Sequence, residues 1–141
     1  MANNFRLANA AADAAAGDGS SVGLAGYIGA SAVVKFYVGA QGASPEAAPA
    51  GTLLSTSGNV VTGSFSNASG DGETDTATVA SDTAVASGTA GSFMLFKSDG
   101  TTPVADGTVG TASTDFVFDN AVFVSGGTIA VSTIAIQVPP H

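Results

Sequence analysis

The 141-residue chain has no cysteine, no tryptophan, one histidine and only three basic residues. Without cysteine it can form neither disulfides nor thiolate metal sites nor a cysteine nucleophile, so packing alone must hold the fold. The histidine, His141, lies beyond two prolines at the end of the chain. A hydroxyl nucleophile needs a base within hydrogen-bond reach, so a catalytic triad is effectively excluded.

Positive charge is scarce: Arg6, Lys35 and Lys97 stand against a formal net charge of −8. Binding to phosphates depends on counterion release by several lysines or arginines. The composition therefore predicts that the protein does not bind nucleic acid. Charged residues make up 10% of the chain, so the surface must consist largely of Ser, Thr, Ala, Gly and Asn.

Long hydrophobic runs are also missing. The uncharged, apolar-leaning run at residues 19–34 falls short of the roughly 18 residues of a spanning helix and is interrupted by Gly23, Gly26 and Gly29. Near the N-terminus, Asn9 and Asp13 interrupt the apolar region that a secretory signal needs. We expect neither a membrane segment nor a secretory signal. With two tyrosines and no tryptophan, a carbohydrate-binding face has little support.

Two groups of carboxylates have a spacing that resembles a functional site. Asp71, Glu73 and Asp75 alternate like the first ligands of a calcium loop, but an EF-hand requires Gly at position 76 and Glu at position 82, which here are Thr and Asp. We expect a solvated loop there. Asp115 and Asp119 flank an alternating strand and are expected to face solvent. The sequence thus predicts no catalytic residue, no metal site, no cofactor and no enzymatic activity.

The clearest structural signal is the region 92–138, where four apolar runs are separated by glycine-rich turns. The apolar run 93–96 leads into Ser98-Asp99-Gly100, and an Asp-Gly pair between apolar runs favours a hairpin because both residues tolerate positive φ. The return strand is predicted at residues 103–109. A second Asp-Gly pair, Asp106-Gly107, is interpreted as an interruption of this strand.

Further strands are predicted at residues 33–38, 53–54, 60–65, 76–85 and 115–119, with a long proline-containing loop at 39–51. About seven or eight short strands at regular intervals predict a mainly β fold, an antiparallel β-sandwich with a jelly-roll-like arrangement. We divide the chain into an N-terminal helix or arm with a glycine-rich connector, residues 1–32, and a sandwich domain, residues 33–141.

The strand around residue 94 is apolar on both faces. Such a strand is either central and covered on both sides, or it presents one face to a partner. We predict self-association and assign Met94 and Phe96 to the interface. Further along, the apolar residues change phase at Ser132-Thr133, between Ile129 and Ile134, which predicts a β-bulge in a strand over residues 128–138.

The N-terminal region contains the one convincing helix signal, residues 5–16, with an asparagine cap before it and Gly17 after it. Its apolar face is mostly methyl groups, so it must lie against something. It could pack on its own sandwich or dock as an arm on a neighbouring subunit. The arm alternative makes Phe5 and Leu7 anchors, lets Arg6 pair with an acidic partner, and predicts that loss of residues 2–17 weakens assembly without lowering the thermal midpoint.

Several segments carry a resemblance to a known group of proteins: residues 4–13, 34–39 followed by Ser44-Pro45, 51–54, and 98–100 leading to 106–110. Through them the chain resembles small β-sandwich structural proteins encoded among the virion genes of tailed bacteriophages. It departs from their pattern at residues 22–32, which are lengthened and rich in glycine.

The resemblance implies a capsid decoration (cement) protein that stabilises a phage head lattice. It implies that the partners are the major capsid protein and further copies of the chain, which would form a homotrimer. It also implies that the protein is located in the virion, which is assembled in the host cytoplasm. A phage tail or head–tail structural subunit is the nearest alternative. An adhesin-like module that binds the host surface is the alternative from another functional class.

Overall fold

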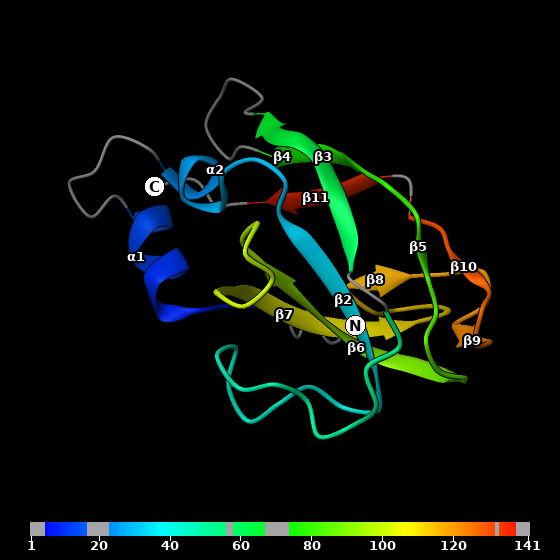
Figure 1. Ribbon diagram of the computed structural model, residues 1–141. Helices are drawn as coiled ribbons and strands as arrows, with labels where there is room; N and C mark the ends of the chain where they lie inside the picture. Colours follow the sequence, from blue (N-terminus) through cyan, green and yellow to red (C-terminus); the bar gives the residue numbers. More distant parts are fainter. Residues whose placement is uncertain (1–4, 17–22, 56–57, 67–73, 132, 138–141) are drawn as a thin grey trace.

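The computed structural model describes residues 5–16, 23–55, 58–66, 74–131 and 133–137. The chain is mainly β, with antiparallel sheets arranged as a β-sandwich and with short helices at one end (Figure 1). This confirms the predicted fold class. The elements are β1 Arg6–Leu7, α1 Asn9–Ala16, α2 Gly23–Ile28, β2 Val33–Val38, β3 Asn59–Ser66, β4 Thr74–Val79, β5 Asp82–Thr83, β6 Gly88–Phe96, β7 Pro103–Gly110, β8 Phe116–Val117, β9 Val122–Phe123, β10 Thr128–Ile129 and β11 Thr133–Gln137.

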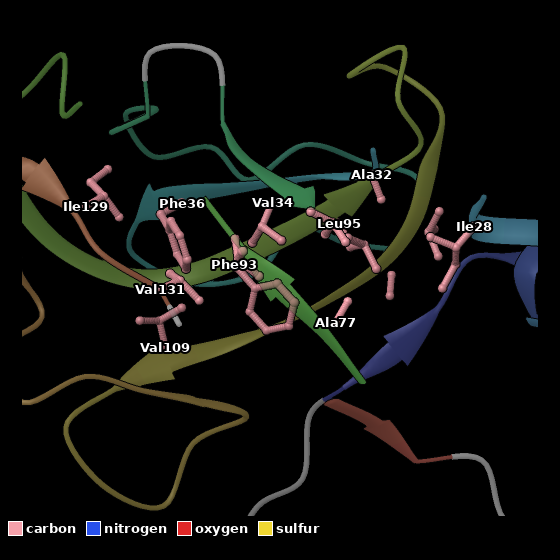
Figure 2. Close-up of a cluster of buried hydrophobic side chains, with 14 of the residues drawn as sticks. Ile28, Ala32, Val34, Phe36, Ala77, Phe93, Leu95, Val109, Ile129 and Val131 are labelled. Atoms are coloured by element: carbon pink, nitrogen blue, oxygen red, sulfur yellow. The ribbon is translucent and has the colours of Figure 1, made fainter. Parts of the chain in front are cut away.

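The main sheet has the strand order β1-β7-β6-β2-β3-β4-β11, with β8 added to β7 and β9 added to β6. Only the β7–β8 pair is parallel among these described pairs. β3 pairs with β2 through Asn59 and Val60, but with β4 from Val61 onward. The sheet therefore folds over at β3, and β4 reaches across the inner face of β2 and β6 (Figure 2).

The core forms between these two layers, because alternating residues of each strand point inward. In β2, Val34 and Phe36 are fully buried. They meet Phe93 and Leu95 of β6 and Ala77 of β4, which the close-up shows pointing toward one another (Figure 2). Full burial of an aromatic or aliphatic side chain of this size stabilises a fold by roughly 1.5–3 kcal/mol.

The hairpin between β6 and β7 forms as predicted. Lys97 N donates to Thr102 O (3.0 Å), Gly100 N donates to Lys97 O (2.9 Å), and Gly100 has φ 70. The second Asp-Gly pair, however, does not interrupt the strand. Asp106 and Gly107 lie inside β7 and pair with Met94 and Phe93 of β6. Glycine is required at position 107 because a Cβ there would lie 2.5 Å from the Phe93 ring.

The N-terminal segment differs from the single helix predicted over residues 5–16. Arg6 and Leu7 form β1, which pairs with Asp106 and Ala105 at the edge of β7, and the helix begins only at Asn9. The backbone groups of Arg6 and Leu7 thus bond to a sheet edge instead of a helical turn. The buried face of α1 is formed by alanines, at positions 11 and 14.

Part of the predicted glycine-rich connector is also helical. Gly23–Ile28 forms α2, whose Leu24 and Ile28 are four residues apart, lie on one face of the helix, and are buried in the main core. Of the two placements considered for the N-terminal helix, the described residues show packing on the chain's own fold. The two helices contact each other at one end of the molecule (Figure 1).

The strand β6 is central and covered on both faces. On the face opposite the main core, Met94 and Phe96 are 1% and 7% exposed and form a second apolar cluster with Val33, Tyr37 and Leu53. The assignment of Met94 and Phe96 to an interface is therefore corrected: β6 lies between β2 and β7, and residues of the chain itself cover its outer face. Self-association stays a prediction, without support from these two side chains.

The end of the chain forms two strands of different sheets. Ile129 of β10 pairs with β5, whereas β11 pairs with β4. The change of phase at Ser132-Thr133 thus falls between strands and not on a bulge within one strand; Ser132 itself lies outside the described residues. Among the described residues, no helix is both long enough and apolar enough to cross a membrane.

Candidate interaction surface

The side chain of Arg6 is held by the chain's own residues. Its Nε donates to Asp106 Oδ1 (3.0 Å), and its Nη2 donates to Asp106 Oδ2 and to Gly42 O (2.9 Å). The hydrogen bond to Asp106 raises the pKa of Arg6 above its ordinary value. Because the Asp106 side chain is 1% exposed, this carboxylate depends on Arg6 for its neutralisation. The acidic partner predicted for Arg6 on another subunit is therefore found within the chain.

The other predicted anchors of the N-terminal arm also lie against the chain itself. The Phe5 ring stacks on the buried ring of Phe93, with 6.5 Å between centroids. Leu7 is partly buried against the main core. The structure thus brings Phe5, Arg6 and Leu7 together at the edge of β7, where they fasten the N-terminal segment to the sheet.

The two lysines contact groups of the chain itself near the end of the molecule that carries the helices. Lys35 Nζ donates to Gly100 O (3.0 Å) and lies 5.1 Å from the centroid of the Phe96 ring. Lys97 Nζ lies 3.8 Å from the centroid of the Tyr27 ring in α2. All three basic side chains of the sequence therefore have partners within the fold.

Several carboxylates bind backbone amides of neighbouring loops. Glu46 accepts a hydrogen bond from Asn9 N (2.7 Å), which lowers its pKa. Asp82 accepts from Gly58 N (2.9 Å). Asp99 accepts from Thr102 Oγ1 and from the amides of Thr102 and Thr101, which lower its pKa to about 2. Asp99 thus stabilises its own turn, whereas Glu46 and Asp82 connect segments that are distant in the sequence.

The expectation that Asp115 and Asp119 both face solvent is wrong for Asp115. Its Oδ2 accepts from Thr108 N and Thr108 Oγ1, at 2.8 Å each, and so connects β8 to β7. Asp119 is exposed as predicted. Phe116 and Phe118 both contact the ring of Phe36.

The predicted acidic loop at Asp71, Glu73 and Asp75 lies mostly outside the described residues, which include only Asp75 of the three. Within the described ranges, no group of three or more His, Cys, Asp or Glu side chains could hold a metal ion.

The large apolar side chains that are exposed among the described residues are valines, at positions 60, 85, 117, 122 and 124. Strand β9, which contains Val122, lies at the end of the molecule opposite the helices (Figure 1). Val122 and Val124 are 54% and 64% exposed, and Val85 is 50% exposed. Val122 and Val124 line a hollow of about 420 Å³, whose other lining residues are Ala84, Phe118, Asp119, Asn120, Phe123, Gly127, Thr128 and Ala130. We call Val85, Val122, Val124 and this hollow the valine surface.

Alternation along the chain builds the valine surface. Ala121 and Phe123 point inward and are buried, so Val122 and Val124 must point outward. The ring of Phe123 packs against Phe36 and Phe118, with centroids 6.0 and 5.4 Å apart, which fixes the orientation of this segment.

A tight turn then joins the segment to its neighbour. Gly127 N donates to Val124 O (2.8 Å), Gly126 N donates to Ala84 O (2.8 Å), and Ser125 Oγ donates to Val85 O (3.4 Å). These bonds hold Val85 beside Val124 although they are far apart in the sequence.

Sequence reasoning did not identify the valine surface. The available signal was the apolar run at residues 121–124, which has no polar face, like the run at 93–96. No family model, no curated protein and no solved structure matches the chain.

Proposed function

We propose that the protein is a non-enzymatic structural component of a tailed-bacteriophage virion, a capsid decoration (cement) protein that stabilises the head lattice by binding the major capsid protein. The observation that carries this proposal is the valine surface. Two β-branched apolar side chains that are more than half exposed, Val122 and Val124, line a hollow at one end of a small sandwich, and the half-exposed Val85 belongs to the same surface. Exposed apolar groups gathered around a hollow are typical of a docking site for another protein.

The use of the charged groups supports a binding role over a catalytic one. A reaction site brings titratable side chains together with perturbed pKa values in a cleft. Here the shifted carboxylates, Glu46 and Asp99, are exposed residues whose pKa values are lowered by structural hydrogen bonds, from Asn9 N to Glu46 and from Thr102 to Asp99. The hollow itself is lined by one carboxylate, Asp119, and by no basic side chain of the described residues.

The proposal is tested by mixing the purified protein with phage heads that lack it and measuring the bound fraction by sedimentation. Val124→Asp should weaken binding roughly tenfold or more, about 1.4 kcal/mol, because it places a charge in an apolar contact. Since Val124 is 64% exposed, this variant should keep its thermal midpoint. Val60→Asp is the matched control, because Val60 is 39% exposed but does not line the hollow.

Copy number separates the alternatives. A decoration protein saturates heads at hundreds of copies per particle by gel densitometry, whereas a tail or head–tail subunit is present in far fewer. An adhesin-like module binds host cells as a free protein and ignores heads. Binding to heads that Val124→Asp and Val60→Asp weaken equally would refute docking through the valine surface.

A further inference from the structure

The hollow of the valine surface combines apolar and acidic groups, and this combination specifies its occupant. Val122 and Val124 supply an apolar rim, and the exposed carboxylate of Asp119 lines the same hollow. We infer that the valine surface binds an extended segment of a different protein that carries a lysine or arginine two residues from a small apolar side chain. The inference rests on the proposed docking function and adds the chemistry of the partner.

No lysine or arginine side chain of the described residues is available to neutralise Asp119. Lys97 lies on Tyr27 of α2, and Lys35 lies on the β6–β7 hairpin. Both helices are at the opposite end of the molecule from β9 and β10 (Figure 1). Arg6 is bound to Asp106 and to the carbonyl of Gly42. Among the described residues, the hollow therefore has a negative charge without a positive counterpart in its lining.

The same charge distribution disfavours a second copy of the chain at this face. Two valine surfaces placed against each other would bring two Asp119 carboxylates into one apolar contact, with each chain carrying a net charge of −8. Like charges in a contact oppose association and exclude wrong partners. A nucleic acid is disfavoured for the same reason. A lysine or arginine of a different protein would instead be attracted to Asp119, whereas a second copy of the chain and a nucleic acid would be repelled by it.

The size of the hollow limits what fits. The hollow has a volume of about 420 Å³, at the lower end of the roughly 300–1,000 Å³ of sites that hold a small molecule. A volume of this size accommodates a few side chains of a bound segment. In an extended segment, side chains two residues apart point to the same face. An apolar residue can then contact Val122 and Val124 while a lysine or arginine two positions away reaches Asp119.

The test uses defined peptides and the full-length protein. Acetyl-Val-Ser-Lys-Ser-Val-amide is titrated into protein with labelled valine methyls, and acetyl-Val-Ser-Glu-Ser-Val-amide is the matched control. The lysine peptide should shift the methyl resonances of Val122 and Val124 and leave those of Val60 in place. Asp119→Asn should weaken its affinity about two- to fivefold, the range expected for an exposed ion pair, and raised salt should do the same.

Equal binding of the two peptides, or an affinity that Asp119→Asn leaves unchanged, would overturn the inference. Failure of both peptides to shift Val122 and Val124 would also overturn it, even if Val124→Asp still weakened binding to phage heads; the proposed function would then stand. If the lysine peptide binds as expected but the protein does not bind heads, the inference stands and the proposed function fails.

Discussion

Replacing Arg6 with alanine should destabilise the protein far more than the exposure of Arg6 suggests. The Arg6 side chain is 36% exposed, but its partner Asp106 is 1% exposed. Removing one member of a buried ion pair typically costs 3–5 kcal/mol, because the other charge stays buried and unpaired. The bonds from Arg6 to Gly42 O and Ala43 O are lost as well. Since Arg6 is partly solvated, we expect the lower part of the range, about 3 kcal/mol.

Replacing the partner, Asp106, with asparagine is expected to cost less stability than replacing Arg6. Asp106→Asn keeps the shape of the side chain and an oxygen that can accept from Arg6 Nε, and the partly exposed guanidinium can still reach water. The expected loss is about 1 kcal/mol. The double variant R6A/D106N carries no buried lone charge and should therefore be more stable than R6A alone, although it contains one more substitution.

Urea unfolding followed by far-ultraviolet circular dichroism measures all three variants against the parent protein. A loss of about 3 kcal/mol corresponds to a fall of about 10 °C in the thermal midpoint for a chain of this length. The slope of the unfolding free energy against urea concentration should stay constant, so that the midpoint reports stability. A loss of less than about 1 kcal/mol for R6A, or a double variant R6A/D106N that is less stable than R6A, would show that Asp106 does not depend on Arg6 for its charge compensation.

Three further predictions concern β7, the hairpin and the N-terminal segment. Gly107→Ala should destabilise by about 1–3 kcal/mol in urea unfolding because its Cβ overlaps the buried Phe93 ring, whereas Gly110→Ala meets only the Thr114 side chain and should cost much less; equal costs would contradict this. Asp99 should titrate near pH 2 by carboxyl-carbon NMR, so its contribution to stability is complete above its ordinary pKa of 3.8 and lost as the pH falls through 2; Thr102→Val should raise this pKa, and an unchanged value would exclude the hydroxyl as its main cause. Loss of residues 2–17 should lower the thermal midpoint, contrary to the arm prediction, because it removes β1 and the buried face of α1; an unchanged midpoint would show that the segment does not stabilise the fold.

Strands whose evidence is local were predictable from the sequence. The alternation of Val34 and Phe36 gave the boundaries of β2, and Asp99-Gly100 marked the hairpin, because both signals depend only on neighbours in the chain. β1 could not be foreseen, since two residues become a strand only through pairing with Asp106, 100 positions away. The helix α2 contains two glycines, and its buried Leu24 and Ile28 show that tertiary packing outweighs local propensity there.

The candidate sites were less predictable than the strands. The sequence predicts that Arg6 can pair with an acidic partner, but it does not indicate Asp106, because the Asp106-Gly107 pair has the composition of a turn and yet lies within strand β7. The runs at residues 93–96 and 121–124 are both apolar at every position, so that each predicts a strand with two apolar faces. Whether the second face is buried, as for Met94, or exposed, as for Val124, depends on which neighbours cover it, and the sequence does not encode that locally.

The central claim is that the valine surface docks this protein on a phage head. A cryo-electron microscopy map of the virion tests it most directly, because one map shows the location, copy number and contact face together. The account predicts many copies over the head lattice, with β9 and the turn at residues 124–127 against the major capsid protein and α1 and α2 directed away. Density for the chain in the tail, or on the head with Val122 and Val124 facing solvent, would contradict it.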